Sequence, residues 1–189
     1  MPIRDRVHDR AVLDALESVE ETSFVGDVFR IARKGRDPIR GSGANGRWSP
    51  NGEFEVLYTS LEREGSLAEI GSRLLLEPVW PSRLQHEIHR IGADAERCLR
   101  FADIASLQPL GVDPARFEGY DYEATQAIAA AAHFLEFDGL IVPSARHASL
   151  NLVLFMDRID GGALEVKSSE DVDWDAWRRA AARSIGVRR

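Results

Sequence analysis

Apolar residues recur at helical spacing in four stretches of the chain, and each stretch predicts a helix. The stretches cover residues 8–20, residues 66–77, an alanine-rich segment at 123–137 and a closing segment at 173–185. In the last of them, Trp174 and Trp177 share one side, so we expect their rings to dock this helix on the rest of the protein.

Short apolar or alternating runs between the helices predict strands. These runs lie at residues 28–32, 55–60, 84–91, 98–102, 140–142, 150–156 and 163–166. Strands and helices are interspersed without a regular strand–helix–strand rhythm, which favours the α+β class. We therefore expect a single domain over residues 1–189, with a mixed β-sheet core and flanking helices.

The composition is that of an ordinary globular protein, with 44% hydrophobic and 29% charged residues among 189. Cys98 is the only cysteine, so an internal disulfide is impossible and a reducing compartment is indicated. Charged residues stand near the N-terminus where a signal peptide needs an apolar run. No apolar stretch is long enough to span a bilayer. These features favour a cytoplasmic protein without membrane contact.

Residues 33–53 form a long loop rich in glycine, proline, serine and asparagine, and loops of this length are usually functional. Asp37 is the only acid between residues 29 and 47, where the chain has six cations: Arg30, Arg33, Lys34, Arg36, Arg40 and Arg47. The whole chain has a net charge of −7. A local cationic segment in an acidic protein indicates a compact anion site rather than a broad nucleic-acid surface.

The segment from Gly41 to Gly46 has the spacing G-x-G-x-x-G. The dinucleotide-binding fingerprint also needs a strand directly before it and a helix opening from it. Pro38 precedes the segment and Trp48-Ser-Pro-Asn-Gly follows it, so no helix opens there. Two interpretations stay open: a flexible loop, or a loop whose backbone N–H groups and arginines hold a phosphate.

Arg30 and Arg47 stand out among the cations. Arg30 lies in an expected strand between apolar residues, and Arg47 precedes Trp48, which we expect to anchor the end of the loop. A guanidinium suits bidentate contact with phosphate. Structural salt bridges are the alternative role for both arginines.

Glu69 also has two candidate roles. Ser66-Leu-Ala-Glu69 has the form of a capping box, which predicts a helix start with a structural glutamate. The spacing alone favours this structural role. A carboxylate at a helix start can also lie at the mouth of a cleft, so the two roles are compatible.

The histidines and Ser144 give weaker evidence of a metal site or a catalytic site. His86 and His89 would point to opposite faces of a strand, which disfavours a metal site. His133 lies in the alanine-rich helix and is expected to pack. Ser144 and His147 are not part of a G-x-S-x-G elbow.

An ordered set of motifs runs through residues 24–160. It comprises Arg30 in VFRIA, Gly46-Arg47-Trp48 followed by Gly52, Tyr58 in VLYTS, Glu69 after Leu67-Ala68, and GLIVPSARHASLNLVLF from Gly139. With these motifs in this order, the chain resembles the RES-domain proteins. These proteins are toxins of bacterial toxin–antitoxin pairs, and they are named for an arginine, a glutamate and a serine. The helix at 123–137 with Gln126 also fits.

The resemblance implies an ADP-ribosyltransferase-like fold that binds NAD and cleaves its nicotinamide–ribose bond without a metal. The acceptor would be inorganic phosphate or water. The implied catalytic residues are Arg30, Tyr58 and Glu69, and the implied NAD-binding residues are Arg30, Arg47, Tyr58, Gln126, Ser144 and Asn151.

Individual roles follow from the same resemblance. Arg30 and Arg47 would contact the pyrophosphate, and Tyr58 would stack on nicotinamide. Glu69 would bind the ribose hydroxyl and stabilise the oxocarbenium-like transition state, with Ser144 lining the same pocket. The chain departs from the family in its unusually basic loop and at Ser49, where an asparagine often follows Arg-Trp.

The resemblance also implies a partner, a small Xre-type helix-turn-helix antitoxin. Two alternatives remain: an ADP-ribosyltransferase that modifies a cellular protein, and a non-catalytic nucleotide- or RNA-binding module. The acidic net charge and the lack of a nucleic-acid-binding motif disfavour direct nucleic-acid binding.

Overall fold

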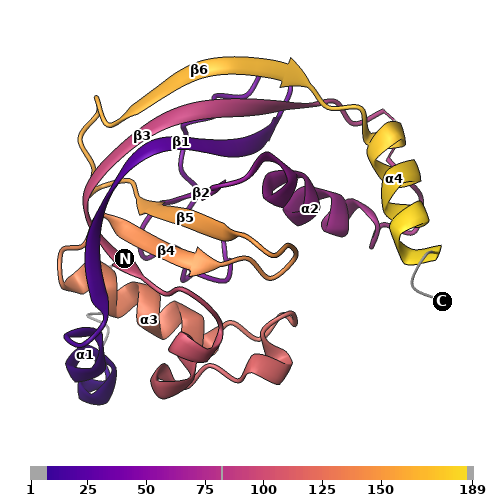
Figure 1. Ribbon diagram of the computed structural model, residues 1–189. Coiled ribbons are helices and arrows are strands. Elements are labelled where there is room, and N and C mark those ends of the chain that lie inside the picture. Colours follow the sequence, from indigo (N-terminus) through magenta and orange to yellow (C-terminus); the bar gives the residue numbers. More distant parts are fainter. Residues whose placement is uncertain (1–7, 82, 187–189) are drawn as a thin grey trace.

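A computed structural model describes residues 8–81 and 83–186, so the charged residues 1–7 lie outside it (Figure 1). The helices are α1 (Arg10–Leu16), α2 (Arg63–Leu74), α3 (Glu123–Phe134) and α4 (Trp174–Gly186), with two short 3₁₀ helices at Ala105–Leu110 and Pro114–Arg116. The strands are β1 (Glu20–Arg33), β2 (Val56–Ser60), β3 (His86–Arg100), β4 (Gly139–Pro143), β5 (Leu150–Phe155) and β6 (Leu164–Asp171).

Five of these strands close into a ring. The strand order is β1-β2-β5-β4-β3, and β1 also pairs with β3, which closes the ring. β6 pairs with residues 87–93 of β3, on the edge where β4 pairs with residues 98–100. In Figure 1 the long strands β1, β3 and β6 arch over β2, β5 and β4. β1 and β3 pair from Glu20↔Arg100 to Arg33↔His86, whereas β1 and β2 pair only at Phe29↔Ser60. The ring is therefore least continuous beside β2.

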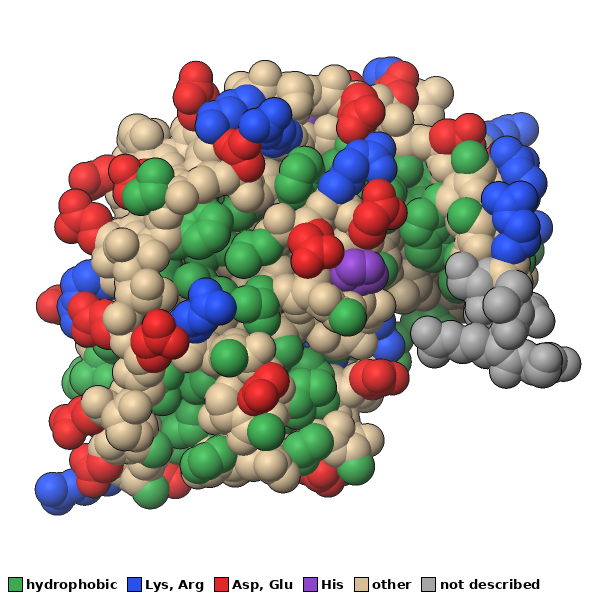
Figure 2. Space-filling model, viewed as in Figure 1, with side chains coloured by type: hydrophobic (Ala, Val, Ile, Leu, Met, Phe, Trp, Pro, Cys, Tyr) green, Lys and Arg blue, Asp and Glu red, His purple; other side chains and the backbone are tan. Residues whose placement is uncertain are grey.

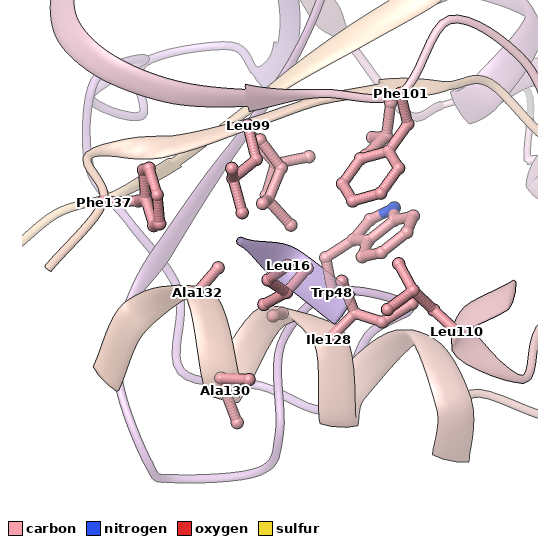
Figure 3. Close-up of a cluster of buried hydrophobic side chains, with 14 of the residues drawn as sticks. Leu16, Trp48, Leu99, Phe101, Leu110, Ile128, Ala130, Ala132 and Phe137 are labelled. Carbon is pink, nitrogen blue, oxygen red and sulfur yellow. The ribbon is translucent and has the colours of Figure 1, made fainter. Parts of the chain in front are cut away.

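Three apolar clusters hold this architecture together. Side chains from all five ring strands fill the interior of the ring, among them Val28, Leu57, Ile91, Ile141 and Leu152. A second cluster joins the outer face of the ring to α3. Its members in Figure 3 include Trp48, Phe101 and Ile128. The third places α2 and α4 against β1 and β3 through Ile31, Leu67, Ile88 and Trp174.

The predicted class is confirmed, because the fold is a mixed α+β structure with a sheet core and flanking helices. Several element lengths were wrong. β1 and β3 are continuous strands, where the sequence predicted 28–32, 84–91 and 98–102. Each long strand is supported by pairing with the other, and this distant partner is invisible to local patterns. The first helix ends at Leu16 because the chain enters β1 at Glu20.

The predicted capping box is wrong. Helix α2 begins at Arg63, after an extended Glu62 whose side chain makes no capping hydrogen bond. The Ser66 N–H donates to the Glu62 carbonyl at 3.2 Å, an ordinary helical contact. Ser66 and Glu69 therefore both lie inside the helix, and Glu69 has no capping role to explain its presence.

Other local predictions are confirmed. Trp174 is buried and Trp177 packs beside it, against the backbone of α2 at Gly71. A side chain at Gly71 would collide with the Trp177 ring. No helix opens from the glycine-rich loop, which instead forms short bridges at Ser42↔Val56 and Gly46↔Ser49. Within the described residues, no helix has the length and apolar character needed to cross a membrane.

Candidate active site

A cavity of about 240 Å³ lies beside α2, where β1 and β2 part. It is lined by residues of β1, the glycine-rich loop, β2, α2, the segment at 120–122 and the end of β4 with the turn into β5. Five of the residues expected from the sequence line it: Arg30, Arg47, Tyr58, Glu69 and Asn151. Elements far apart in the chain thus bring these five residues together, whereas Ser144 and Gln126, also expected at the site, are not among the lining residues.

Two hydrogen bonds to one oxygen fix the Glu69 carboxylate. The Ser144 hydroxyl donates to Glu69 Oε1 at 2.6 Å, and the Asn151 amide donates to the same oxygen at 3.2 Å. Ser144 itself accepts a hydrogen bond from the Arg146 N–H at 3.1 Å. Within the described residues, Oε2 of Glu69 accepts no hydrogen bond, so one carboxylate oxygen is oriented by the protein and the other is free for a ligand.

Tyr58 forms a wall of the cavity and also holds the loop. Its hydroxyl accepts a hydrogen bond from the Trp48 N–H at 2.9 Å. A Cβ at Gly46 would lie 2.7 Å from this hydroxyl, so the close approach of the loop requires glycine. Burial raises the pKa of Tyr58 to about 12. The phenol is therefore protonated at neutral pH and offers a ring surface rather than a base.

The Arg30 guanidinium is half-buried and only partly satisfied. Its Nη2 donates to the Arg40 carbonyl at 3.1 Å, whereas the buried Nη1 has no partner among the described residues. Burial lowers the pKa of Arg30, and the negative charge of Asp37 acts in the opposite direction. A buried, unpaired donor at a cavity wall indicates a site for an anionic or polar ligand.

The Arg47 guanidinium lies against aromatic rings. Its carbon atom is 4.6 Å from the Phe117 ring centroid and 4.9 Å from that of Tyr122, and Nη2 donates to the Gly119 carbonyl at 3.1 Å. Burial lowers the pKa of Arg47, while Tyr122 and Glu69 act in the opposite direction. These contacts leave Arg47 charged, rigid and without a carboxylate partner in the described residues.

Two further arginines, Arg73 and Arg146, line the same cavity. In the described residues, none of the four arginines lies within ion-pair distance of a carboxylate. Elsewhere arginines commonly pair, as in Arg63–Glu170, Arg90–Asp27 and Arg97–Glu21. The face in Figure 2 likewise shows acidic and basic side chains interspersed. Against this background, four unpaired cations and one carboxylate give this cavity an excess of positive charge.

Gln126 does not line the cavity. Its amide donates to Asn45 Oδ1 at 2.7 Å and to the Gly46 carbonyl at 2.8 Å, so it holds the glycine-rich loop from behind. Ser49 is fully buried in the same loop and donates to the Ala44 carbonyl at 2.9 Å. The serine at this position is thus used to close the loop.

The histidines make structural contacts. The Trp174 indole N–H donates to His86 Nδ1 at 3.0 Å, and His89 Nδ1 lies 2.7 Å from Ser169 Oγ. His133 stacks on Phe54, as its place in the alanine-rich helix predicted. In the part of the chain that the structure describes, no group of three or more His, Cys, Asp or Glu side chains could hold a metal ion.

The residues of the cavity wall that the sequence did not predict include two arginines and two tyrosines: Arg73, Tyr120, Tyr122 and Arg146. Helical spacing could have found Arg73, which follows Glu69 by one turn. Arg146 stands two residues after Ser144, in a motif that was already recognised. The two tyrosines lie in an irregular segment, where no periodic signal exists to mark them.

The structure is thus an α+β protein with a preformed cavity lined by four arginines and a glutamate. The RES domain family matches residues 27–175. This match covers most of the chain, and the protein belongs to the RES domain family.

Relatives of known name agree with this assignment. The chain is 24% identical over 170 residues to the NAD(+) phosphorylase MbcT of Mycobacterium tuberculosis (strain ATCC 25618 / H37Rv), covering 87% of this chain and 91% of the relative. It is 33% identical over 109 residues to the probable NAD(+) phosphorylase Rv3189 of the same strain, covering 58% of this chain and 50% of that protein.

A solved structure has the same fold. The crystal structure of the M. tuberculosis MbcT–MbcA toxin–antitoxin complex matches with a TM-score of 0.79 at 20% identity, covering 90% of this chain and 97% of the matched chain.

Proposed function

We propose that this protein is an enzyme that binds NAD, cleaves its nicotinamide–ribose bond and acts as the toxin of a toxin–antitoxin pair. The observation that carries this proposal is the Glu69 carboxylate, which Ser144 and Asn151 orient inside a cavity lined by four unpaired arginines. Membership of the RES family and the names of the relatives support it.

The cavity suits the parts of NAD by charge and shape. The diphosphate would lie against Arg30 and Arg47, which are half-buried and have no carboxylate partner in the described residues. The nicotinamide would stack on the Tyr58 ring. The ribose would then lie next to Glu69, whose Oε2 accepts no hydrogen bond within the described residues.

Breaking this glycosidic bond needs charge stabilisation more than acid catalysis. Nicotinamide leaves as a neutral molecule with the bonding electron pair, so no proton has to be donated to it. Positive charge develops on the ribose as the bond breaks, and the fixed Glu69 carboxylate stabilises that charge. The protonated Tyr58 phenol is consistent with this scheme, because no base is needed at its position.

The acceptor is inorganic phosphate in the proposed reaction. The relatives are named NAD(+) phosphorylases, and the cavity has more cations than one diphosphate neutralises. Nicotinamide is released and the C1″ carbon of ribose becomes bonded to a phosphate oxygen. Water is the competing acceptor, and it gives ADP-ribose instead.

We expect the purified protein to release nicotinamide from NAD in the presence of EDTA. With phosphate added, chromatography should show ADP-ribose-1″-phosphate; without it, ADP-ribose should appear more slowly. NAD that stays intact at high enzyme concentration, with any bound inhibitor removed, would contradict the proposal. Loss of turnover with EDTA would show that a metal takes part, and labelled protein would indicate ADP-ribosyl transfer.

The proposed partner is an Xre-type helix-turn-helix antitoxin encoded beside this gene, and the proposed compartment is the cytoplasm, where NAD is available. The structural neighbour was solved as a toxin–antitoxin complex. An acidic group of the partner, placed against Arg30 and Arg47, would occupy the diphosphate position and block the cavity.

Expression of the chain alone should stop bacterial growth and deplete cellular NAD. Co-expression with the adjacent gene should restore both, and expression of the Glu69→Gln variant without the partner should be harmless at equal protein level. Measuring culture density and NAD together separates the outcomes. Harmless accumulation of active enzyme without its partner would refute the toxin role while leaving the NAD chemistry in place.

A further inference from the structure

The four arginines of the cavity fall into an inner group and an outer residue. Arg30, Arg47 and Arg146 are half-buried, whereas Arg73 is exposed. Arg146 lies over the Tyr120 ring at 5.7 Å and lowers the pKa of Arg47, after the larger effect of burial, so these two cations are neighbours. The inner group is therefore the more sheltered one, and Arg73 is the cation of the cavity that is most open to solvent.

Arg73 is placed by α2. It follows Glu69 by four residues and Ser66 by seven, so the helix presents a hydroxyl, a carboxylate and a guanidinium along one stripe of the cavity wall. The positive charge of Arg73 also acts on Tyr58, where it opposes the dominant effect of burial on the pKa. The guanidinium thus lies near Tyr58, on the helix turn that follows Glu69.

Glutamate followed by arginine four residues later is the favourable order for a helical ion pair. Here the pair does not form. Glu69 Oε1 instead accepts hydrogen bonds from Ser144 and Asn151, which turn the carboxylate toward β4 and β5. Within the described residues, the Arg73 guanidinium makes neither a hydrogen bond nor an ion pair. A cation kept apart from an adjacent carboxylate is available to a second anion.

The charges in the cavity leave room for that second anion. Four guanidinium groups and one carboxylate line it, so the cavity has an excess of positive charge over the two negative charges of a diphosphate. Like charges gathered in one cavity repel each other unless anions neutralise them. Because Arg73 is exposed, a small anion can reach it from solvent while NAD fills the inner part.

We propose that Arg73 forms a second anion subsite that binds inorganic phosphate and presents it to the ribose beside Glu69. This inference rests on the proposed function and specifies where the acceptor binds. The C1″–N bond of NAD breaks and nicotinamide leaves with the electron pair. An oxygen lone pair of HPO₄²⁻ forms the new C1″–O bond, and the phosphate keeps its proton in the ADP-ribose-1″-phosphate product.

Initial rates with varied phosphate and with varied NAD test this subsite. Arg73→Ala should raise the KM for phosphate by about 10–100-fold, the range expected for losing a hydrogen-bonded charge. The KM for NAD should rise far less, and the product should shift from ADP-ribose-1″-phosphate toward ADP-ribose. Sulfate, a tetrahedral dianion that does not react, should compete with phosphate in the native protein and lose this effect in Arg73→Ala.

Two matched variants control the experiment. Arg73→Lys keeps a point charge without the planar fork, so its KM for phosphate should fall between the native protein and Arg73→Ala. Arg179→Ala removes an exposed helical arginine from α4, outside the cavity, and its kinetics should match those of the native protein.

The outcomes separate this inference from the proposed function. Equal rises of both KM values in Arg73→Ala, or an unchanged KM for phosphate, would overturn the subsite. ADP-ribose as the sole product of the native protein at every phosphate concentration would also overturn it, while NAD cleavage would stand. In this experiment, a native protein that leaves NAD intact would overturn the proposed NAD cleavage itself.

Discussion

Replacing Glu69 by Gln should lower the turnover of NAD by about 10²–10⁴-fold, which corresponds to roughly 3–5 kcal/mol of activation free energy. The amide keeps an oxygen that can accept the hydrogen bonds of Ser144 and Asn151, so the side chain should stay in place. What disappears is the negative charge that stabilises the developing oxocarbenium. Steady-state kinetics measure the loss, and thermal unfolding should show little change.

Glu64→Gln provides the matched control on the same helix. Glu64 lies in the first turn of α2, is exposed and pairs with Arg63 at 3.3 Å, outside the cavity. The same change of charge there should leave turnover near the native value. Comparable losses in the two variants would show that the charge of α2 in general is responsible, and the catalytic role of Glu69 would be rejected.

Replacing Trp48 by Ala should lower the free energy of unfolding by about 3–5 kcal/mol. Trp48 is 2% exposed and packs in the cluster between the ring and α3 (Figure 3). In a chain of this size that loss corresponds to roughly a 6–20 °C fall in Tm. Because Trp48 also tethers the loop that carries Arg47, NAD affinity should fall as well.

Trp48→Phe and Trp80→Ala control this experiment. Phenylalanine retains most of the buried ring surface, so Trp48→Phe should recover a large part of the lost stability. Trp80 is only half-buried, below the Arg178 guanidinium, and its replacement by Ala should cost clearly less than that of Trp48. Equal losses for Trp48→Ala and Trp80→Ala would contradict the assignment of Trp48 as a core anchor.

Helix α2 illustrates how far local patterns could be taken. The apolar spacing of Leu67, Ile70 and Leu74 correctly predicted a helix, but its start was placed at Ser66. The start was placed there because Ser66-Leu-Ala-Glu69 has the form of a capping box. In the structure Gly65 lies inside the helix, where a side chain would collide with the hydroxyls of Ser60 and Ser149. A tertiary contact thus requires glycine at position 65, and a local sequence pattern does not reveal this contact.

The long strands β1 and β3 also show the limit of local sequence patterns, which predicted strands that were too short. β1 carries mixed polar and apolar residues over much of its length, so only 28–32 read as a strand. Its remaining residues extend because β3 pairs with them from Glu20↔Arg100 onward. Such pairing between distant segments leaves no mark in a local window of sequence.

By itself, the sequence determined the α+β class, the presence of the four helices and the docking role of the tryptophans. Through the order of its motifs, it also determined the set of candidate residues. Those properties depend on local periodicity and on residue identity, which can be read directly. The tertiary structure alone decided that Ser144 and Asn151 orient Glu69, that Gln126 supports the loop from behind, and that Arg73 and Arg146 join the cavity. These relations arise when the ring closes and brings β1, α2 and the turn between β4 and β5 together, and this closure depends on contacts between residues far apart in the chain.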